Sequence, residues 1–298
     1  MRKKIVIFGG SGFLGSHVAD FLTKMKNHVI IFDKKNSEYL LPNQKFIKGN
    51  ILDIQKVFEV TKRADYVFNF SGEADIENSK KNPLSTINSN IIGTTNILES
   101  CVKNKIKKYI HASTVYVNSE QGGFYRSTKH AAELIIENYN EFFKLNYVIM
   151  RFGSLYGPRA NKFNFISKSI DDAIERKVIN RIGNGEEIRQ YIHISDAAEI
   201  CCKMLNNKYN NKYLNITGSG TPLKVKNVLN IIKEIIGSDV KIKFNKKNVL
   251  KDHYKITPYS YKTRIAKKVS LNEHIDLGEG LLDLVNQKIK EINEWFFN

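Results

Sequence analysis

A glycine-rich turn between an apolar run and a helix-compatible segment constrains this chain more than any other feature. The run Lys4-Ile-Val-Ile-Phe8 leads directly into Gly9-Gly-Ser-Gly12-Phe-Leu-Gly15. The predicted order is therefore strand, turn, helix. Glycines at this spacing permit a tight turn, close approach of the backbone to a pyrophosphate, and close packing of the helix on the strand. The helix N-terminus would meet the phosphates with unpaired N–H groups and a positive dipole end.

An acidic residue closes the next predicted strand. Asp33 follows His28-Val-Ile-Ile-Phe32, at about the twenty-residue distance expected of a carboxylate that binds the ribose. A glycine turn alone is common for structural reasons, but together with Asp33 it predicts a dinucleotide site. The carboxylate favours NAD, because it would repel a 2′-phosphate. Lys34 and Lys35 follow at once, so NADP stays open as the less favoured cofactor.

Strand and helix patterns alternate through the N-terminal half. Short apolar strands are predicted at 4–8, 28–32, 45–48, 65–70, 107–112 and 146–151. Helices are predicted near 12–26, 54–63, 84–104 and 125–143. This alternation predicts an α/β fold with a Rossmann-type, doubly wound parallel sheet and right-handed crossovers. Within 84–104 the periodicity places four apolar residues on one core-facing stripe: Ile87, Ile91, Leu98 and Val102.

The pattern loosens after about residue 157. A polar helical stretch (161–177) and a short strand precede a helix from Ser195, a strand at Tyr213–Thr217 and a helix from Pro222. The sequence from Lys241 is basic and irregular until a final amphipathic helix near 279–296. We expect an NAD-binding domain over 1–157, to which 187–217 returns. A smaller, interleaved C-terminal substrate lobe would comprise 158–186 and 218–298.

The net charge of +17 raises nucleic acid as a partner. Most of this charge is lysine spread along the whole chain, with the densest runs at 103–108 and 241–247. Each run is more simply a solvated helix end or an exposed strand edge, so nucleic acid is disfavoured. A basic surface would also steer an anionic small substrate toward the protein.

Other sequence features exclude several classes of protein. No apolar run is long enough to cross a bilayer, and the N-terminal sequence does not match a signal peptide. The three cysteines, Cys101, Cys201 and Cys202, lack metal-ligand spacing and predict a reduced, cytoplasmic setting. The seven histidines form no pair at metal-ligand spacing, so no metal site is expected.

A tyrosine and a lysine stand one helical turn apart after the fifth predicted strand. Tyr125 and Lys129 would share one face of their helix. A nearby ammonium and an oxidised nicotinamide both favour the phenolate, so Tyr125 is a candidate general base. Ser113 and Thr114, at the end of the preceding strand, offer a hydroxyl to a substrate oxygen. A tyrosine and a lysine four positions apart are a weak motif by themselves. Their position after the Ser113–Thr114 pair in a predicted dinucleotide-binding fold makes a catalytic role more credible.

Several ordered segments together resemble the NAD-dependent nucleotide-sugar epimerase/dehydratase family of extended short-chain dehydrogenases/reductases. The similarity runs almost from end to end. Besides the glycine turn, Asp33, Tyr125 and Lys129, it rests on the segments Val67–Ala74, Asn90–Thr94, Ala112–Thr114, Arg151–Pro158, Gly183–Asp196 and Ile275–Gly280.

The resemblance implies a role for individual residues. Tyr125 would be the catalytic base, Lys129 would hold the ribose and lower the pKa of Tyr125, and Thr114 would supply the catalytic hydroxyl. The implied cofactor contacts are Gly9, Gly12, Phe13, Leu14, Asp33, Asn50, Ile51, Phe70, Ser71, Gly72 and Lys129. The implied substrate contacts are Ser113, Ser154 and Arg189, the last suited to gripping phosphate oxygens in bidentate fashion.

The chain also departs from the family pattern. Asn50 and Ser154 stand where the family usually has Asp and Asn. Thr114 and Tyr125 are only eleven positions apart, so the usual active-site loop is shortened and the sugar pocket is opened or reshaped. Val115 and Tyr116 follow Thr114 where dehydratases carry acidic residues, which disfavours a 4,6-dehydratase. Glu73 and Glu120 are the remaining acids that could take that role.

The sequence thus favours an NAD-dependent nucleotide-sugar epimerase, acting at C4 through a keto sugar with transient hydride transfer to NAD. The alternative is a keto-sugar reductase or dehydrogenase of the same family that consumes NAD(P)H. A non-catalytic, NAD-bound or RNA-binding relative is a weaker hypothesis, suggested by the charge and the short loop. The resemblance further implies a homodimer through the helices near 84–104 and 125–143.

Overall fold

The computed structural model describes residues 2–218, 221–245 and 253–258. Residues Met1–Lys262 form one compact unit. The amphipathic helix predicted near 279–296 lies outside the described residues.

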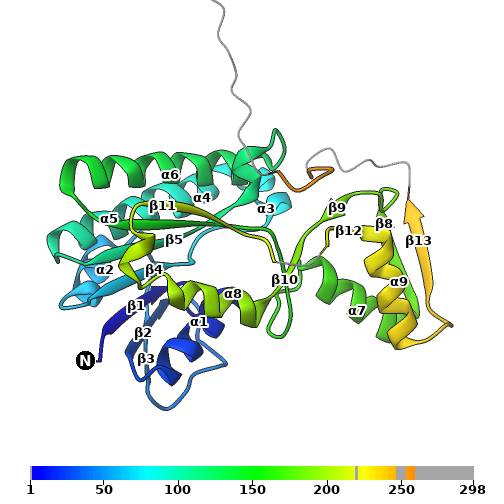
Figure 1. Cartoon of the computed structure of the whole chain (residues 1–298), viewed down its shortest axis with the longest axis horizontal. Helices are drawn as coiled ribbons and strands as arrows, with labels where there is room; N and C mark the ends of the chain where they lie inside the picture. Colours follow the sequence, from blue (N-terminus) through cyan, green and yellow to red (C-terminus); the bar gives the residue numbers. More distant parts are fainter. Residues whose placement is uncertain (1, 219–220, 246–252, 259–298) are drawn as a thin grey trace, which may run out of the picture. The chain divides into compact units, whose positions relative to one another are not determined.

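A seven-stranded parallel sheet confirms the predicted fold class (Figure 1). Its strands are β1 (Lys4–Phe8), β2 (His28–Asp33), β3 (Gln44–Lys48), β4 (Tyr66–Asn69), β5 (Lys108–Thr114), β6 (Tyr147–Phe152) and β11 (Lys212–Ile216). They lie in the order β11-β6-β5-β4-β1-β2-β3. The chain runs outward in one direction through β2 and β3 and in the other through β4, β5 and β6. The order therefore reverses between β1 and β4, and a ligand crevice is expected beyond the carboxyl ends of these two strands.

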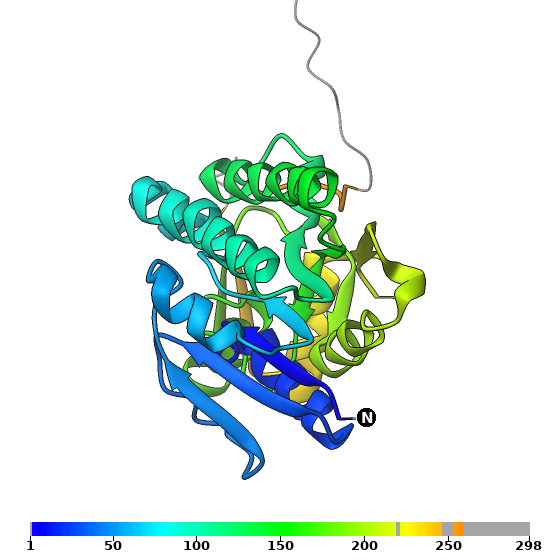
Figure 2. The same cartoon turned by 90° about the vertical axis from the view of Figure 1, so that its left-hand side faces the viewer.

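Helices cover both faces of this sheet, which explains the continuous apolar character of its central strands. Strand alternation sends Ile5 and Ile7 to one face, where α1 (Phe13–Lys24) and α8 (Ile194–Lys203) complete a core. Val6 and Phe8 point to the other face. There α2 (Ile54–Thr61), α5 (Gly93–Lys103) and α6 (Gly123–Phe143) close a second core (Figure 2).

The helix predicted over 84–104 is three elements. A π-helical turn, η1 (Asn88–Ile92), separates α4 (Pro83–Ile87) from α5. A π turn inserts one residue and rotates everything after it, so the predicted stripe is only partly right. Leu98 is buried, but Ile87, Ile91 and Val102 are only half-buried. The π turn also buries a polar residue, Asn90.

A smaller group of elements follows β6 and builds a third core. It contains α7 (Phe165–Arg176), β8 (Val178–Ile182), α9 (Val225–Ile236) and β13 (Lys241–Asn245). Two pairs of short strands lie outside the large sheet. β7 (Ser154–Tyr156) pairs with β10 (Tyr191–His193), and β9 (Ile188–Arg189) pairs with β12 (Leu223–Lys224). β11 then returns to the large sheet beside β6.

Two predictions for this part were wrong. The helix expected from Pro222 begins at Val225, because Leu223 and Lys224 pair with β9. The stretch expected to be irregular from Lys241 starts as β13, a strand parallel to β8. Its exposed lysines hid the alternation from the sequence pattern, although Ile242 and Phe244 pack against the third core.

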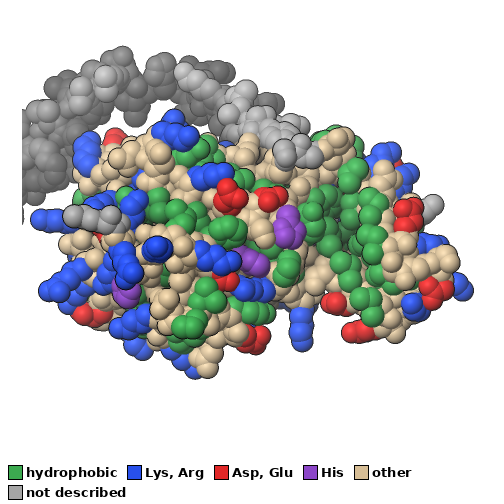
Figure 3. Space-filling model, turned by 60° about the horizontal axis from the view of Figure 1, so that its bottom comes forward, with side chains coloured by type: hydrophobic (Ala, Val, Ile, Leu, Met, Phe, Trp, Pro, Cys, Tyr) green, Lys and Arg blue, Asp and Glu red, His purple; other side chains and the backbone are tan. Residues whose placement is uncertain are grey.

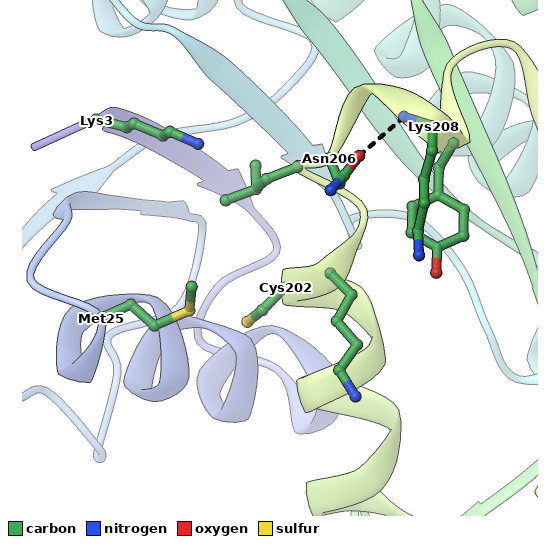
Figure 4. A pocket seen from close by; sticks show the side chains of 8 residues that line it. Lys3, Met25, Cys202, Asn206 and Lys208 are labelled. Carbon is green, nitrogen blue, oxygen red and sulfur yellow. Dashed lines mark hydrogen bonds between the residues drawn. The ribbon is translucent and has the colours of Figure 1, made fainter. Parts of the chain in front are cut away.

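Lys108 corrects the expectation that the basic run 103–108 is a solvated helix end. Its side chain is 1% exposed. Nζ donates to the carbonyl oxygens of Met204 at 3.0 Å and Asn206 at 2.9 Å, just after α8. Figure 4 shows a small pocket beside this turn, lined by Lys3, Met25, Cys202, Asn206 and Lys208, among others. Because Lys3 precedes β1, the pocket lies at the opposite end of the strand from the glycine turn.

On the face in Figure 3, lysine and arginine side chains are interspersed with neutral and acidic ones. Within the described part of the chain, no helix is both long and apolar enough to cross a membrane.

Candidate active site

The turn predicted to bind a pyrophosphate is packed too closely for a side chain at Gly9 or Gly15. Gly9 has φ +73°, and a Cβ there would lie 2.6 Å from the backbone N of Ser71. A Cβ on Gly15 would lie 2.2 Å from the carbonyl oxygen of Gly9, so α1 packs directly on the turn. Gly12 precedes α1 as its N-cap residue. Phe13 and Leu14 begin the helix, with Leu14 buried and Phe13 half-buried.

Asp33 is fixed against the turn. One carboxylate oxygen accepts from Ser11 N at 3.1 Å, and the other accepts from Lys35 N at 3.0 Å. A carboxylate has about four acceptor positions, so these two bonds leave capacity for the ribose hydroxyls of NAD. Asn50 is exposed and caps its own turn through Leu52 N, while Ile51 is buried against Gly93.

The segment after β4, residues 70–72, is predicted to lie along the cofactor, and we call it the cofactor wall. Phe70 N donates to Phe8 O at 2.9 Å, which ties this segment to β1. The hydroxyl and N–H of Ser71 both donate to the Oδ1 of Asn69. A Cβ on Gly72 would lie 2.3 Å from Asn90 Oδ1. The wall therefore depends on Asn90, a residue that the prediction did not single out.

Asn90 fixes this wall from the π turn. Its Oδ1 accepts from Glu73 N at 2.7 Å, and its Nδ2 donates to Thr128 Oγ1 at 3.0 Å. Thr128 adjoins Lys129 on α6, so one amide connects the cofactor wall to the helix that carries the candidate base. The sequence analysis includes Asn90 in the segment Asn90–Thr94 of the family resemblance but assigns it no role.

The three predicted catalytic residues come together at the end of β5 and the start of α6. Thr114 is the last residue of β5, and its hydroxyl lies near enough to the Tyr125 phenol to lower the pKa of Tyr125. Lys129 is buried, and its Nζ donates to Ala112 O at 2.9 Å. A Cβ on Gly72 would lie 3.9 Å from this Nζ. The ammonium thus lies beside the cofactor wall.

Burial dominates the electrostatics of this group. It raises the pKa of Tyr125 to about 12, against the opposing effect of the nearby Thr114 hydroxyl. It lowers the pKa of Lys129 to about 8, although the Glu133 carboxylate favours the ammonium. The sequence led us to expect a lowered pKa for Tyr125. In the protein alone the shift has the opposite sign, because the phenolate loses more hydration than its neighbours restore.

Ser113 does not join the catalytic group. Successive strand residues face opposite sides of a sheet, and the Ser113 hydroxyl donates to the buried Glu133 carboxylate. Arg151 forms a two-point ion pair with the same carboxylate, at 3.0 and 2.6 Å. The structure therefore uses Ser113 to tie β5 to α6.

Ser154 and Arg189 lie on short strands beyond the large sheet. Ser154 begins β7, where its N–H donates to Gln190 O at 3.2 Å. Arg189, on β9, is 7% exposed. Its guanidinium lies 4.1 Å from the ring centroid of Tyr254 and donates to the carbonyl oxygens of Ile188 and Lys255. Among the described residues it forms no ion pair, so it keeps donors for an anionic ligand.

The glycine turn after β1, Asp33 at the end of β2, and Thr114, Tyr125 and Lys129 beyond β5 have the arrangement predicted for the short-chain dehydrogenase/reductase type. The chain matches the model of the NAD dependent epimerase/dehydratase family over residues 5–217. It therefore belongs to that family.

Curated relatives of the chain include both epimerases and dehydratases. It is 31% identical over 276 residues to a dTDP-D-glucose 4,6-dehydratase of Dictyostelium discoideum, covering 80% of this chain and 62% of that protein. The chain thus spans less than two thirds of that relative's length. It is 28% identical over 305 residues to a putative UDP-glucose 4-epimerase of Methanocaldococcus jannaschii, covering 95% of this chain and 97% of that protein.

Among solved structures, the UDP-glucose 4-epimerase of Thermotoga maritima, determined with UDP-glucose, is similar with a TM-score of 0.79. It is 25% identical, and the match covers 87% of this chain and 90% of that one.

Proposed function

We propose that this enzyme is a nucleotide-sugar epimerase acting at C4. The observation that supports the proposal most is that Thr114 and Tyr125 lie near each other at the start of the helix that carries the buried Lys129. Bound NAD would supply reversible hydride acceptance. Gly9, Gly12, Asp33, Ser71 and Lys129 are the residues that would hold it.

The protein's own residues would then handle the protons. Tyr125 would take the proton of the sugar hydroxyl at the carbon to be oxidised, and Thr114 would donate a hydrogen bond to that oxygen as it becomes a ketone. Lys129, with a pKa of about 8, is mainly protonated at neutral pH. It would hold the ribose and favour charge on Tyr125. Rotation of the keto sugar and return of the hydride to its other face would complete the inversion.

A dehydratase would need a further acid near the sugar, and the described residues give little support for one. Val115 and Tyr116 follow Thr114 in the turn η2 (Val115–Asn118). Both carboxylate oxygens of Glu73 already accept hydrogen bonds, from Asp75 N and from the side chain of Asn78. We therefore retain the proposal that the protein is an epimerase, with a keto-sugar reductase as the alternative function.

The proposal is tested with purified full-length protein and its Tyr125→Phe variant. We expect the wild type to carry NAD and interconvert C4 epimers without added cofactor. Loss of the base should reduce kcat by about 10²- to 10⁴-fold. NAD content should be unchanged, because Tyr125→Phe removes only the hydroxyl.

Three outcomes separate the alternatives. Net consumption of added NADH with a keto sugar would identify a reductase. Release of water from a nucleotide-hexose would identify a dehydratase. Absence of turnover across UDP-, GDP-, CDP- and dTDP-sugars would contradict the proposed function.

We also propose a homodimer and a substrate lobe. Large apolar side chains are exposed on the neighbouring elements α4, η1 and α6, namely Leu84, Ile92, Leu134 and Phe142. A second copy of the chain would cover them, since large exposed apolar patches mark interaction sites. The elements of the third core, α7, β8, α9 and β13, would form the lobe that holds the nucleotide-sugar.

A further inference from the structure

A buried carboxylate lies one helical turn beyond Lys129 on α6. Glu133 is 1% exposed and follows Lys129 by four residues, so the two side chains share one face of the helix. The Lys129 ammonium donates to Ala112 O, but it forms no ion pair among the described residues. Because burying an unpaired charge is costly, this ammonium needs a counter-charge at longer range.

Two neighbouring strands hold the Glu133 carboxylate in place. The register of β5 and β6 sets Ser113 beside Arg151, and both side chains reach this carboxylate. The Ser113 hydroxyl donates to Oε1. Arg151 donates from Nε to Oε1 at 3.0 Å and from Nη2 to Oε2 at 2.6 Å. Three hydrogen bonds from the sheet therefore fix both the position and the plane of the carboxylate.

Arg151 is also held on its other sides. Its Nη1 donates to Asn118 Oδ1 at 3.3 Å, and its guanidinium lies 4.6 Å from the ring centroid of Tyr213. The Arg151 side chain is 20% exposed, so water reaches part of it. Lys129 is buried more deeply. A loss of charge at Glu133 would therefore leave Lys129 with less compensation from water than Arg151.

The charged and titratable groups around Lys129 come from α6, β5, β6 and the segment after the cofactor wall, namely Tyr125, Glu133, His111, Arg151 and Glu73. His111 is fully buried, and burial together with the charge of Lys129 holds its pKa well below the ordinary value. It therefore adds no charge at neutral pH. Glu73 acts on Tyr125, whereas Glu133 is the carboxylate that acts on Lys129.

The far side of Tyr125 contributes further groups. Tyr116 contacts the Tyr125 ring edge-on at 6.1 Å, and its hydroxyl is hydrogen-bonded to His253 Nδ1 at 2.6 Å. Tyr254 also acts on Tyr125. Arg126, the next residue of α6, donates to Ser119 O at 2.8 Å. These groups surround the phenol of Tyr125 and leave Glu133 as the counter-charge of Lys129.

We propose that Glu133 is a positioning residue whose carboxylate, fixed by Ser113 and Arg151, is the counter-charge that holds the Lys129 ammonium beside Tyr125. The inference rests on the proposed function, in which Lys129 holds the ribose and favours charge on Tyr125. Glu133 acts through Lys129 and not on the substrate. Because Arg151 occupies both carboxylate oxygens, Lys129 keeps two of its three N–H donors for the ribose.

The test follows the titration of Lys129 in full-length, NAD-loaded protein labelled with carbon-13 at the ε carbon of lysine. The Lys129 resonance is the one that Lys129→Met lacks. In Glu133→Gln, which removes the charge and keeps the shape, Lys129 should titrate about one pH unit lower than in the wild type. Under the proposed function, the alkaline limb of kcat moves with it. At the pH where the wild-type Lys129 is half protonated, kcat should fall about fivefold.

Two further variants separate charge from packing. Arg151→Lys keeps both charges but loses the two-point geometry, so it should lower Tm and leave the titration of Lys129 near that of the wild type. Glu133→Gln/Arg151→Met removes the arginine that the single variant leaves unpaired, and Lys129 should again titrate below the wild type. This double variant keeps the test decisive if Glu133→Gln does not fold.

Lys108 provides a control within the same spectra. It is buried at the other end of β5 with a pKa of about 8, and it should titrate alike in every variant. An unchanged titration of Lys129 in the Glu133 variants, or an equal displacement in Arg151→Lys, overturns the role of Glu133. The expected displacement without turnover of any nucleotide-sugar by the wild type would instead contradict the proposed epimerase and support Glu133 as the counter-charge.

Discussion

At the scale of single residues, Lys108 and Lys129 are nearly inaccessible to solvent, and burial lowers the pKa of each side chain. Lys129 contacts Ala112 O beside the cofactor wall, and Lys108 contacts two carbonyl oxygens at the end of α8. In both, desolvation lowers the pKa to about 8. Only Lys129 lies in the candidate site. A perturbed pKa is therefore insufficient to identify a functional lysine in this protein.

Lys108 gives a pH-dependent stability with a definite sign. Its folded pKa, about 8, lies below the ordinary value of 10.5. Between these two values the unfolded chain binds more protons, so the free energy of unfolding rises with pH. A neutral amine still has two N–H groups for Met204 O and Asn206 O, so both hydrogen bonds survive deprotonation.

We therefore expect the stability of the wild type relative to Lys108→Met to increase by on the order of 1 kcal/mol between pH 8 and pH 9.5. Denaturant unfolding of both proteins at each pH measures this difference, and the comparison cancels the titration of other groups. A difference that stays constant or decreases over this range would contradict a buried ammonium.

Sequence spacing was sufficient to predict which residues lie together when those residues are close in the sequence. Tyr125 and Lys129 share a helix, and Thr114 ends the strand before it, so the order of elements brings them together. For Ser113 the resemblance predicts a substrate contact but gives no partner within the protein, and in the structure its hydroxyl donates to Glu133. The contacts of Tyr254 with Tyr116 and Arg189 could not be predicted, because they join segments that no local pattern relates.

At the scale of elements, helix α1 packs so closely on the glycine turn that position 15 has no room for a side chain. The Cβ of an alanine at position 15 would meet Gly9 O at 2.2 Å and Gly10 Cα at 2.9 Å. Both atoms belong to the backbone, so no side-chain rotation can relieve the overlap. Helix α1 would have to move away from the turn that is expected to bind the pyrophosphate.

Gly15→Ala should therefore lower stability by about 1–3 kcal/mol, the usual cost of overpacking, and reduce NAD content. Thermal unfolding and quantification of released nucleotide measure the two effects. Ser16→Ala, the next residue of α1, removes a local hydrogen bond to Phe13 O and should retain both properties. Normal NAD content in Gly15→Ala would show that the turn tolerates a displaced helix.

The strands of the large sheet were predicted to within two residues because burial on both faces leaves unbroken apolar runs. The π turn η1 was not predictable in this way. A hydrophobic pattern shows how often apolar residues recur along a helix. The one residue inserted by a π turn shifts which face the following residues occupy, and the amino-acid composition gives no sign of that shift. The same limit applies to β13, where lysines at alternate positions conceal a strand.

At the scale of the whole molecule, the proposed homodimer makes a prediction about association. Leu134, on α6, is 50% exposed, and Leu134→Glu would place a charge in the proposed interface. We expect sedimentation to give a dimer for the wild type and a monomer for this variant, with unchanged circular dichroism.

Ile235→Glu is the matched control, because Ile235 is 78% exposed but lies on α9. It should remain dimeric. A monomeric wild type, or dissociation of both variants alike, would contradict an interface through α4, η1 and α6.

His253 meets the Tyr116 hydroxyl of η2 from 137 positions away, whereas Thr114, Tyr125 and Lys129 belong to one continuous stretch of chain. During synthesis the ribosome therefore releases Thr114, Tyr125 and Lys129 long before it releases His253. The surroundings of Tyr116 can be completed only after residue 253 has been made, so a nascent chain that already contains all three predicted catalytic residues still lacks this contact.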